Sequence, residues 1–160
     1  MQWVTLQLDR VLPERLDAEV VLADGRKTRP LMIHHAVLGS LERCLALLLE
    51  EHRGVLPFWL APEQVALAPL SATQESAACA MMRSLQAAGL RCVLSEPHET
   101  LSRRIVIARE QAIPVFATVG PREAAAGTLT LRGRDGATAV RTVEEAIGWL
   151  KKLEAADPVA

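Results

Sequence analysis

From residue 65 onward, apolar segments of strand length alternate with longer apolar segments of helical period, and this alternation constrains the fold most. Ser71 with Gln74, and Thr142 with Glu145, have the spacing of a capping box at a helix N-terminus. The nearly continuous apolar run 113–119 is typical of a central strand that is buried on both faces. The pattern predicts strands at 65–70, 91–95, 113–119, 128–133 and 138–141 and helices at 71–89, 100–112 and 142–153. The order β-α-β-α-β-β-β-α predicts an α/β domain with a mixed sheet and helices on its faces.

The first fifty residues show a different organisation. Apolar and polar residues alternate over 4–8, which predicts a strand. Residues 16–22 and 31–34 are expected to form a hairpin around the turn at Asp24-Gly25, with 26–29 as its charged tip.

Leucines spaced three and four residues apart predict a helix over 36–53, which Gly54 would end. The stretch that follows is short and rich in glycine and proline, as linkers are. We therefore expect four parts: a first block (1–54), a linker (55–62), an α/β domain (63–154) and a tail (155–160).

Composition excludes several classes of protein. The chain has 160 residues and is 50% apolar, which allows one ordinary domain with a core, or a domain plus part of another. A net charge of −1 argues against a non-specific nucleic-acid binder, and no DNA binding is expected. The longest apolar stretch, 44–49, is far too short to span a bilayer. No secretion signal opens the chain, and Cys44, Cys79 and Cys92 lack paired spacing, which predicts free thiols in a reducing cytoplasm.

The run from Arg29 to Arg43, RPLMIHHAVLGSLER, resembles motif 3 of the class II aminoacyl-tRNA synthetases in its threonyl form. Residues 5–9 and 12–16 are similar to the strand and loop that precede this motif in the family. Residues 60–65 resemble the entry to its anticodon-binding domain. The resemblance covers nearly the whole chain in order. It implies a hairpin, a strand and the motif 3 helix of a class II core, followed by an anticodon-binding domain with a five-stranded mixed sheet and three helices.

The resemblance assigns roles in motif 3. Arg43 matches the arginine that contacts the ATP γ-phosphate, and a planar guanidinium suits that task. Gly39 and Ser40 match the floor of the pocket, and Gln7 matches a polar residue beside the substrate. His34 matches one ligand of the family's threonine-binding zinc ion. His35 replaces a usual arginine, and Cys44 a usual aromatic residue.

The other two zinc ligands, and motifs 1 and 2, have no counterpart in this sequence. A zinc site needs three protein ligands. We therefore expect no aminoacylation by this polypeptide alone, and no cofactor. ATP and zinc are expected only when the missing catalytic portion is supplied.

The resemblance implies that the α/β domain (63–154) carries residues with which the family reads the anticodon. Glu123 and Arg132 match the family's glutamate and arginine, and strand parity turns Arg132 away from Leu129 and Leu131. A carboxylate accepts from the amino group of guanine or cytosine, and an arginine donates two hydrogen bonds to guanine. Glu99 also matches the family.

Other positions in this block depart from the family pattern. His98 stands where asparagine is expected, and Val106 and Ile107 replace polar residues. Arg103, Arg104 and Arg109 are candidates for phosphate contacts, which position RNA without specifying its sequence. From Trp59 onward the sequence has eleven basic and eleven acidic side chains, so their charges balance. We expect weak, salt-sensitive binding of a threonine-type anticodon arm.

Three functions remain open. The chain is a freestanding tRNA-binding module, a C-terminal piece of a split or truncated threonine–tRNA ligase, or a relic that serves protein–protein contact. Residues 1–50 would leave an apolar stripe and a strand edge in water, so we expect them to form a homodimer or bind a protein partner.

Overall fold

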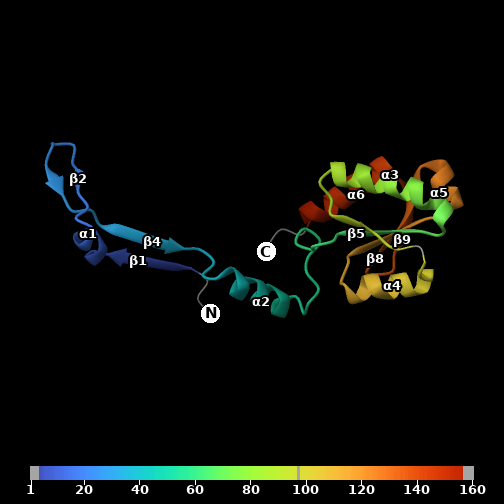
Figure 1. Cartoon of the computed structure of the whole chain (residues 1–160), viewed down its shortest axis with the longest axis horizontal. Coiled ribbons are helices and arrows are strands. Elements are labelled where there is room, and N and C mark those ends of the chain that lie inside the picture. The colour runs from blue at the N-terminus through green and yellow to red at the C-terminus, as the bar shows by residue number, and fades with distance from the viewer. Residues whose placement is uncertain (1–3, 97, 157–160) are drawn as a thin grey trace. The chain divides into compact units, whose positions relative to one another are not determined.

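The computed structural model describes residues 4–96 and 98–156. The chain divides into two compact units, unit 1 (Met1–Glu51) and unit 2 (His52–Ala160), whose elements are labelled in Figure 1. This boundary falls within the last turn of the helix that was expected over 36–53. Residues 52–62 belong to unit 2.

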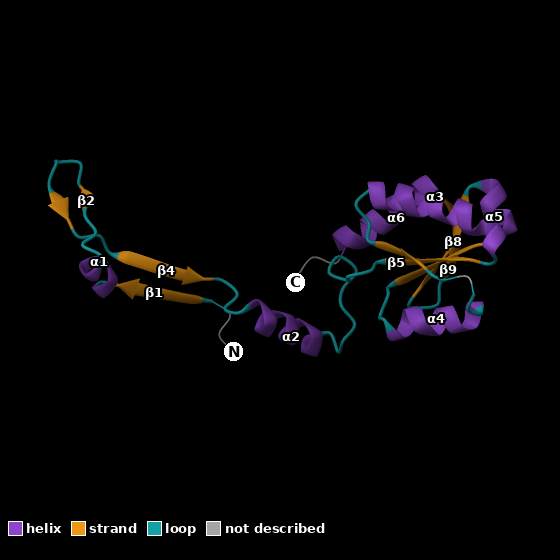
Figure 2. Cartoon of the chain, in the orientation of Figure 1, coloured by secondary structure: helices purple, strands orange, loops and turns teal. Residues whose placement is uncertain are grey.

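Unit 1 contains two separate two-stranded sheets, which Figure 2 shows in orange. Strand β1 (Thr5–Asp9) pairs antiparallel with β4 (Met32–Ala36), so that Gln7 lies opposite His34. The second sheet is a short hairpin of β2 (Val20–Val21) and β3 (Lys27–Thr28). The expected pairing of 16–22 with 31–34 is therefore wrong, although the turn at Asp24-Gly25 is correctly placed.

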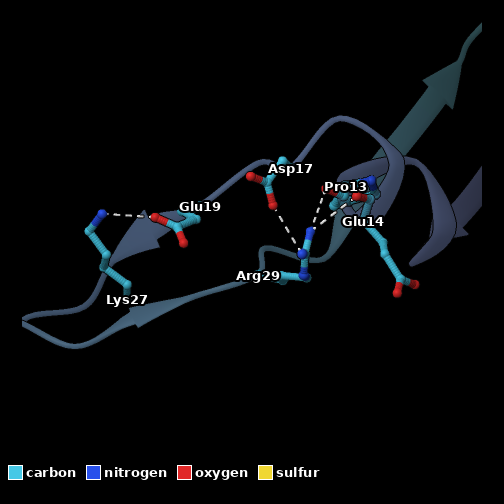
Figure 3. Close-up of polar contacts among 6 residues, drawn as sticks. All are labelled: Pro13, Glu14, Asp17, Glu19, Lys27 and Arg29. Carbon is cyan, nitrogen blue, oxygen red and sulfur yellow. Dashed lines mark hydrogen bonds and ion pairs between the residues drawn. The ribbon is translucent and has the colours of Figure 1, made fainter.

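Ionic contacts occur in and near the hairpin, and Lys27 Nζ lies 2.9 Å from Glu19 Oε2 (Figure 3). Helix α1 (Val11–Arg15) follows β1, and Asp9 Oδ1 accepts hydrogen bonds from the N–H of the next helix residues, Val11 at 2.8 Å and Leu12 at 2.9 Å. Arg29 Nη1 donates to the carbonyls of Pro13 and Glu14, both at 3.2 Å, and its Nη2 pairs with an aspartate, Asp17, at 3.0 Å. Arg29 therefore anchors α1 and is not part of a hairpin tip.

Helix α2 (Leu41–Glu51) is shorter than the helix expected over 36–53. Ala36 is the last residue of β4. Gly39 has φ = +63°, a left-handed conformation that a right-handed helix cannot contain, so the helix begins after it. Ser40 then caps α2, since its Oγ accepts from the Arg43 N–H at 3.2 Å. The predicted helix therefore began five residues too early.

Unit 2 is built on a five-stranded sheet in the order β6-β5-β7-β8-β9. Its strands are β5 (Val65–Pro69), β6 (Cys92–Leu94), β7 (Val115–Val119), β8 (Thr128–Gly133) and β9 (Thr138–Thr142). Strand β5 runs parallel to β6 and β7, whereas β7-β8 and β8-β9 are antiparallel. This confirms the predicted α/β fold with a mixed five-stranded sheet.

Helices cover the two faces of this sheet unequally (Figures 1 and 2). Helices α3 (Glu75–Ala87) and α6 (Val143–Ala156) lie on one face, and α4 (Leu101–Glu110) lies on the other. The larger core packs under α3 and α6 around Leu67, Leu129 and Leu131, whose side chains are almost wholly buried. A smaller core under α4 joins Ala66 and Ala68 of β5 to Phe116 of β7.

A fourth helix of unit 2, α5 (Pro121–Ala126), was not expected. Pro121 occupies its first turn, where a missing N–H costs nothing. Gly127 ends it with φ = +65°, in the left-handed region that suits glycine at a helix C-terminus. This helix places Glu123 next to β8.

Candidate nucleic-acid interface

The face of β8 and β9 opposite the main core is polar and exposed. Because Leu129 and Leu131 point into that core, Thr128, Thr130 and Arg132 point to the other side. On this side Arg132 lies between Phe116 of β7 and Thr138 of β9, and Thr130 lies opposite Val140, which is 63% exposed. The arrangement presents hydroxyl groups and one guanidinium on the side of the sheet that also carries α4.

Glu123 adds a carboxylate to this surface. Its Oε1 accepts a hydrogen bond from Thr130 Oγ1 at 2.9 Å, and its Oε2 accepts from the Gly120 N–H at 3.1 Å. The pKa of Glu123 lies below its usual range, first because its own backbone N–H donates to the carboxylate and then because the Thr130 hydroxyl does. The carboxylate is therefore ionised at neutral pH.

Gly120 leaves open the space beside the Glu123 carboxylate. A Cβ at position 120 would lie 2.8 Å from Glu123 Oε2 and 2.9 Å from Leu70 Cδ1. Any larger residue would push the carboxylate out of place.

The loop before α4 carries a second group of the predicted residues. His98 Nε2 lies 3.0 Å from Glu96 Oε2, and both side chains are at least 70% exposed. Glu99 is exposed as well. Thr100 caps α4 by accepting from the Arg103 N–H at 3.2 Å, and the Arg103 side chain is half exposed.

Arg104 does not lie on the surface with them. It is only 4% exposed, and its Nη1 donates to the carbonyl of Pro69, the last residue of β5, at 2.7 Å. This burial does not favour the expected phosphate contact by Arg104. The physical reason is its position on the buried stripe of α4, three residues after Leu101 and four before Ala108.

The predicted residues thus form two groups on either side of α4. On the β6 side a cavity of ≈ 320 Å³ is lined by His98, Glu99 and Arg104 together with apolar residues of β5, β6 and α4. On the β8 side a hollow of ≈ 30 Å³ is lined by residues that include Arg109 and Arg132. Glu123 and Arg132 belong to one surface, and Glu99 and His98 belong to the other.

The motif 3 residues lie in unit 1. Gln7 and His34 face each other across β1 and β4, and His34 Nε2 lies 3.3 Å from Asp9 Oδ2. The pKa of Asp9 is lowered, mainly by the Leu12 N–H. Arg43 is exposed in the first turn of α2.

Among the described residues, no three metal-ligating side chains gather into a cluster that could hold a metal ion. Nor does any helix in the described part of the chain have the length and hydropathy to cross a membrane.

The polar sheet face, with the Glu123 carboxylate and the Arg132 guanidinium beside it, is built on the fold of the anticodon-binding domains. The family model for the anticodon binding domain matches residues 64–153, which is more than half of the chain. The chain belongs to this family.

Within that family it matches the C-terminal region of threonyl-tRNA synthetases. It is 45% identical over 148 residues to a threonine–tRNA ligase of Caulobacter vibrioides, covering 92% of this chain and 23% of the relative. It is 42% identical over 134 residues to the threonine–tRNA ligase catalytic subunit of Sulfurisphaera tokodaii, covering 84% of this chain and 25% of that protein. The chain thus spans about a quarter of the length of these relatives.

A solved structure agrees with this assignment. The RNA binding domain of threonyl-tRNA synthetase from Cryptosporidium parvum superposes with a TM-score of 0.83 at 30% identity. The match covers 96% of this chain and 39% of that one.

Proposed function

We propose that unit 2, through the domain at 63–154, binds the anticodon arm of a tRNA, and that the threonine type is preferred. One observation carries the proposal: Arg132 is exposed on the polar side of β8, and Glu123 of α5 accepts a hydrogen bond from Thr130 on the same side of that strand. Unstacked loop bases offer hydrogen-bonding edges to such a face.

The chemistry of the two groups is complementary. Glu123 is an ionised acceptor that Thr130 and Gly120 hold in place, so it suits the amino group of a base. Arg132 is an exposed donor two residues further along the same strand face as Thr130, a separation of roughly 7 Å. Two neighbouring bases of a loop, or two edges of one base, fit that spacing.

The test is binding of labelled anticodon stem-loops, measured by fluorescence anisotropy. The set contains the threonine anticodon and loops in which each anticodon base is replaced in turn. We expect the threonine loop to bind more tightly than the replaced loops, and Arg132→Ala to weaken it by about 5- to 150-fold. Arg83→Ala, an exposed arginine on α3, is the matched control and should bind like the parent chain. Equal affinity for every loop, unchanged by Arg132→Ala, would refute the proposal.

A second function is favoured by the extent of the match. Because the chain covers 23% and 25% of the lengths of the two ligases, it fits the C-terminal portion of such an enzyme. Threonine-dependent ATP–pyrophosphate exchange should then appear only when the remaining portion is added in trans. Exchange by this chain alone, at a rate that Arg43→Ala abolishes, would contradict that assignment.

A third function concerns unit 1. Leu6, Leu8 and Ile33 share one face of the β1–β4 pair and are 64%, 66% and 57% exposed. An apolar face of this kind is a candidate interface, either with a second copy or with a protein partner. Sedimentation at tens of micromolar should reveal self-association, or association with the supplied catalytic portion. A monomer that binds neither would exclude this function.

A further inference from the structure

The side chain of Arg134 joins three segments of unit 2 that are far apart in the sequence. Arg134 lies in the turn between β8 and β9. Its Nη1 donates to the carbonyl of Leu56 at 3.2 Å, and its Nη2 donates to the carbonyl of Ala112. Leu56 lies in the segment before β5, and Ala112 lies between α4 and β7. One guanidinium therefore ties the turn to two other parts of the domain.

Both acceptors belong to segments that are fixed by other contacts. Leu56 is 8% exposed, and Arg91 holds the chain just after it through two backbone carbonyls, at 2.7 and 2.9 Å. The Ala112 N–H donates to the carbonyl of Arg109, in the last turn of α4, at 3.0 Å. The two carbonyls are thus firm attachment points for Arg134.

The turn that carries Arg134 is closed by hydrogen bonds of its own. The Gly133 N–H donates to the Ala137 carbonyl at 3.0 Å, and the Gly136 N–H donates to the Gly133 carbonyl at 3.1 Å. Asp135 Oδ1 accepts from the Ala137 N–H at 3.0 Å. Because these bonds make the turn one unit, a displacement of Arg134 also displaces Gly133 and the end of β8.

Arg132 lies at that end of β8, directly before Gly133. Arg132 and Arg134 line the same hollow of ≈ 30 Å³ beside α4. Within the described part of the chain, no side-chain hydrogen bond or ion pair holds the Arg132 guanidinium. Its direction is therefore set by the backbone that carries it. A recognition group must be held within about 0.5 Å of its productive position, so this backbone has to be anchored.

The shape of the guanidinium suits the anchoring role of Arg134. It is planar and has five N–H donors, so it can bind two different carbonyls at once. The ammonium group of a lysine carries the same charge on a single atom and cannot reproduce that fork. One of the two carbonyls, that of Ala112, also lies just beyond the C-terminus of α4, where a cation is favoured.

We propose that Arg134 is a positioning residue for Arg132. By binding the carbonyls of Leu56 and Ala112 it fixes the end of β8, and with it the direction in which Arg132 faces the RNA. The inference rests on the proposed RNA-binding function. The segment 55–62, which was expected to be a linker, then contributes to the RNA site through its Leu56 carbonyl.

The experiment measures binding of the anticodon stem-loops to the full chain by fluorescence anisotropy. The readout is the ratio of Kd values at the loop position where Arg132→Ala removes a base preference. Arg134→Lys keeps the charge and should lower this ratio by roughly 5-fold or more, with the salt dependence of binding unchanged. In the Arg132→Ala background, Arg134→Lys should change the ratio by less than about 2-fold, because the two residues act as one unit. Arg83→Lys is the matched control.

A second pair of variants tests the turn without altering Arg134. Asp135→Ala removes the acceptor of the Ala137 N–H at an exposed side chain and should lower the same ratio. Asp135→Asn keeps an acceptor oxygen and should behave like the parent chain. Circular dichroism checks that each variant is folded. If Arg134→Lys does not fold, the comparison of Asp135→Ala with Asp135→Asn decides.

The outcomes separate this inference from the proposed function. A parent chain that binds no stem-loop would overturn both. Arg132-dependent discrimination that survives Arg134→Lys, or survives Asp135→Ala where Arg134→Lys does not fold, would overturn this inference alone. If Arg134→Gln leaves the ratio unchanged and lowers the slope of log K against log salt concentration by about 0.7, then Arg134 contacts a phosphate, and the inference is overturned as well.

Discussion

The hydrogen bond from Thr130 Oγ1 to Glu123 Oε1, 2.9 Å long, joins β8 to α5 at the proposed anticodon surface. Thr130→Val removes the donor and keeps the β-branched shape that suits a strand. The Glu123 carboxylate would then keep its contact with the Gly120 N–H, at 3.1 Å, and would be free to turn away from β8. We expect the variant to be less stable and to bind the threonine stem-loop less tightly.

The magnitude follows from the exposure of the pair. A hydrogen bond to a charged group contributes about 1.5–3 kcal/mol to the free energy of unfolding. Thr130 and Glu123 are only half-buried, and solvent screening reduces the contribution to about 1 kcal/mol. For a domain of this size, such a loss lowers Tm by roughly 4 °C.

The effect should depend on pH in a defined direction. The folded-state pKa of Glu123 lies below its ordinary value of 4.5, so the bond to Thr130 stabilises the fold above that value. This stabilisation is lost as the pH falls through the lowered folded-state pKa, because the protonated carboxyl no longer gains from the donor. The parent and the variant should therefore differ at pH 7 and converge as the pH falls well below 4.5.

The measurement is urea unfolding followed by far-UV circular dichroism at pH 7 and at acid pH. Thr128→Val is the matched control, since Thr128 lies on the same strand face and its hydroxyl makes no hydrogen bond within the described part of the protein. A destabilisation that is equal at the two pH values, or equal in Thr128→Val, would refute the reasoning.

Three further changes test the fold and the site. Leu131→Ala, at a side chain that is 1% exposed, should lower the free energy of unfolding by about 2–5 kcal/mol in denaturant titrations. Gly127→Ala forces a side chain into φ = +65° and should cost about 1–2 kcal/mol, measured the same way. Arg132→Ala should reduce discrimination between stem-loops and leave the salt dependence of binding nearly unchanged. Arg109→Ala, if Arg109 contacts a phosphate, should lower the slope of log K against log salt concentration by about 0.7.

Local signals predicted the helices and strands of unit 2 well, because capping boxes and strand alternation are short-range patterns. In the predicted capping box at Thr142, the Thr142 N–H donates to Glu145 Oε2 at 3.0 Å and the Glu145 N–H donates to Thr142 Oγ1 at 3.2 Å. The alternation of side chains along β8 correctly predicted that Arg132 points away from Leu129 and Leu131. Helix α5 was missed because its six residues are too few to show a helical period, and only Pro121 and Gly127 mark its ends.

Unit 1 was harder to predict because its pairing is not local. The turn at Asp24-Gly25 correctly indicated a hairpin, but strand β4 pairs with β1, which lies beyond both α1 and that hairpin in the sequence. An alternating pattern of apolar and polar residues identifies a strand, but it carries no information on which other strand will pair with it. Arg104 illustrates a different point. Its spacing from Leu101 and Ala108 already placed it on the buried stripe of α4, whereas its charge alone suggested a phosphate contact.

The position of the site follows from the order of the strands. The crossovers β5-α3-β6 and β6-α4-β7 move in opposite directions along the sheet, because β6 and β7 lie on either side of β5. Right-handed crossovers in opposite directions place α3 and α4 on opposite faces, as Figure 1 shows. Strands β8 and β9 join by a tight turn, and α6 returns to the face of α3, so α4 is the only long helix of the described unit 2 on the other face.

The same topology explains why the candidate residues gather where they do. Glu99 follows the carboxyl end of β6, Glu123 follows that of β7, and Arg104 binds the last carbonyl of β5. In open α/β sheets, ligands bind at the carboxyl ends of parallel strands where the chain reverses its direction along the sheet. Because β5 is that point of reversal, α4 stands between the two halves of one site. An RNA loop that places one base on each side of α4 would use both groups of residues.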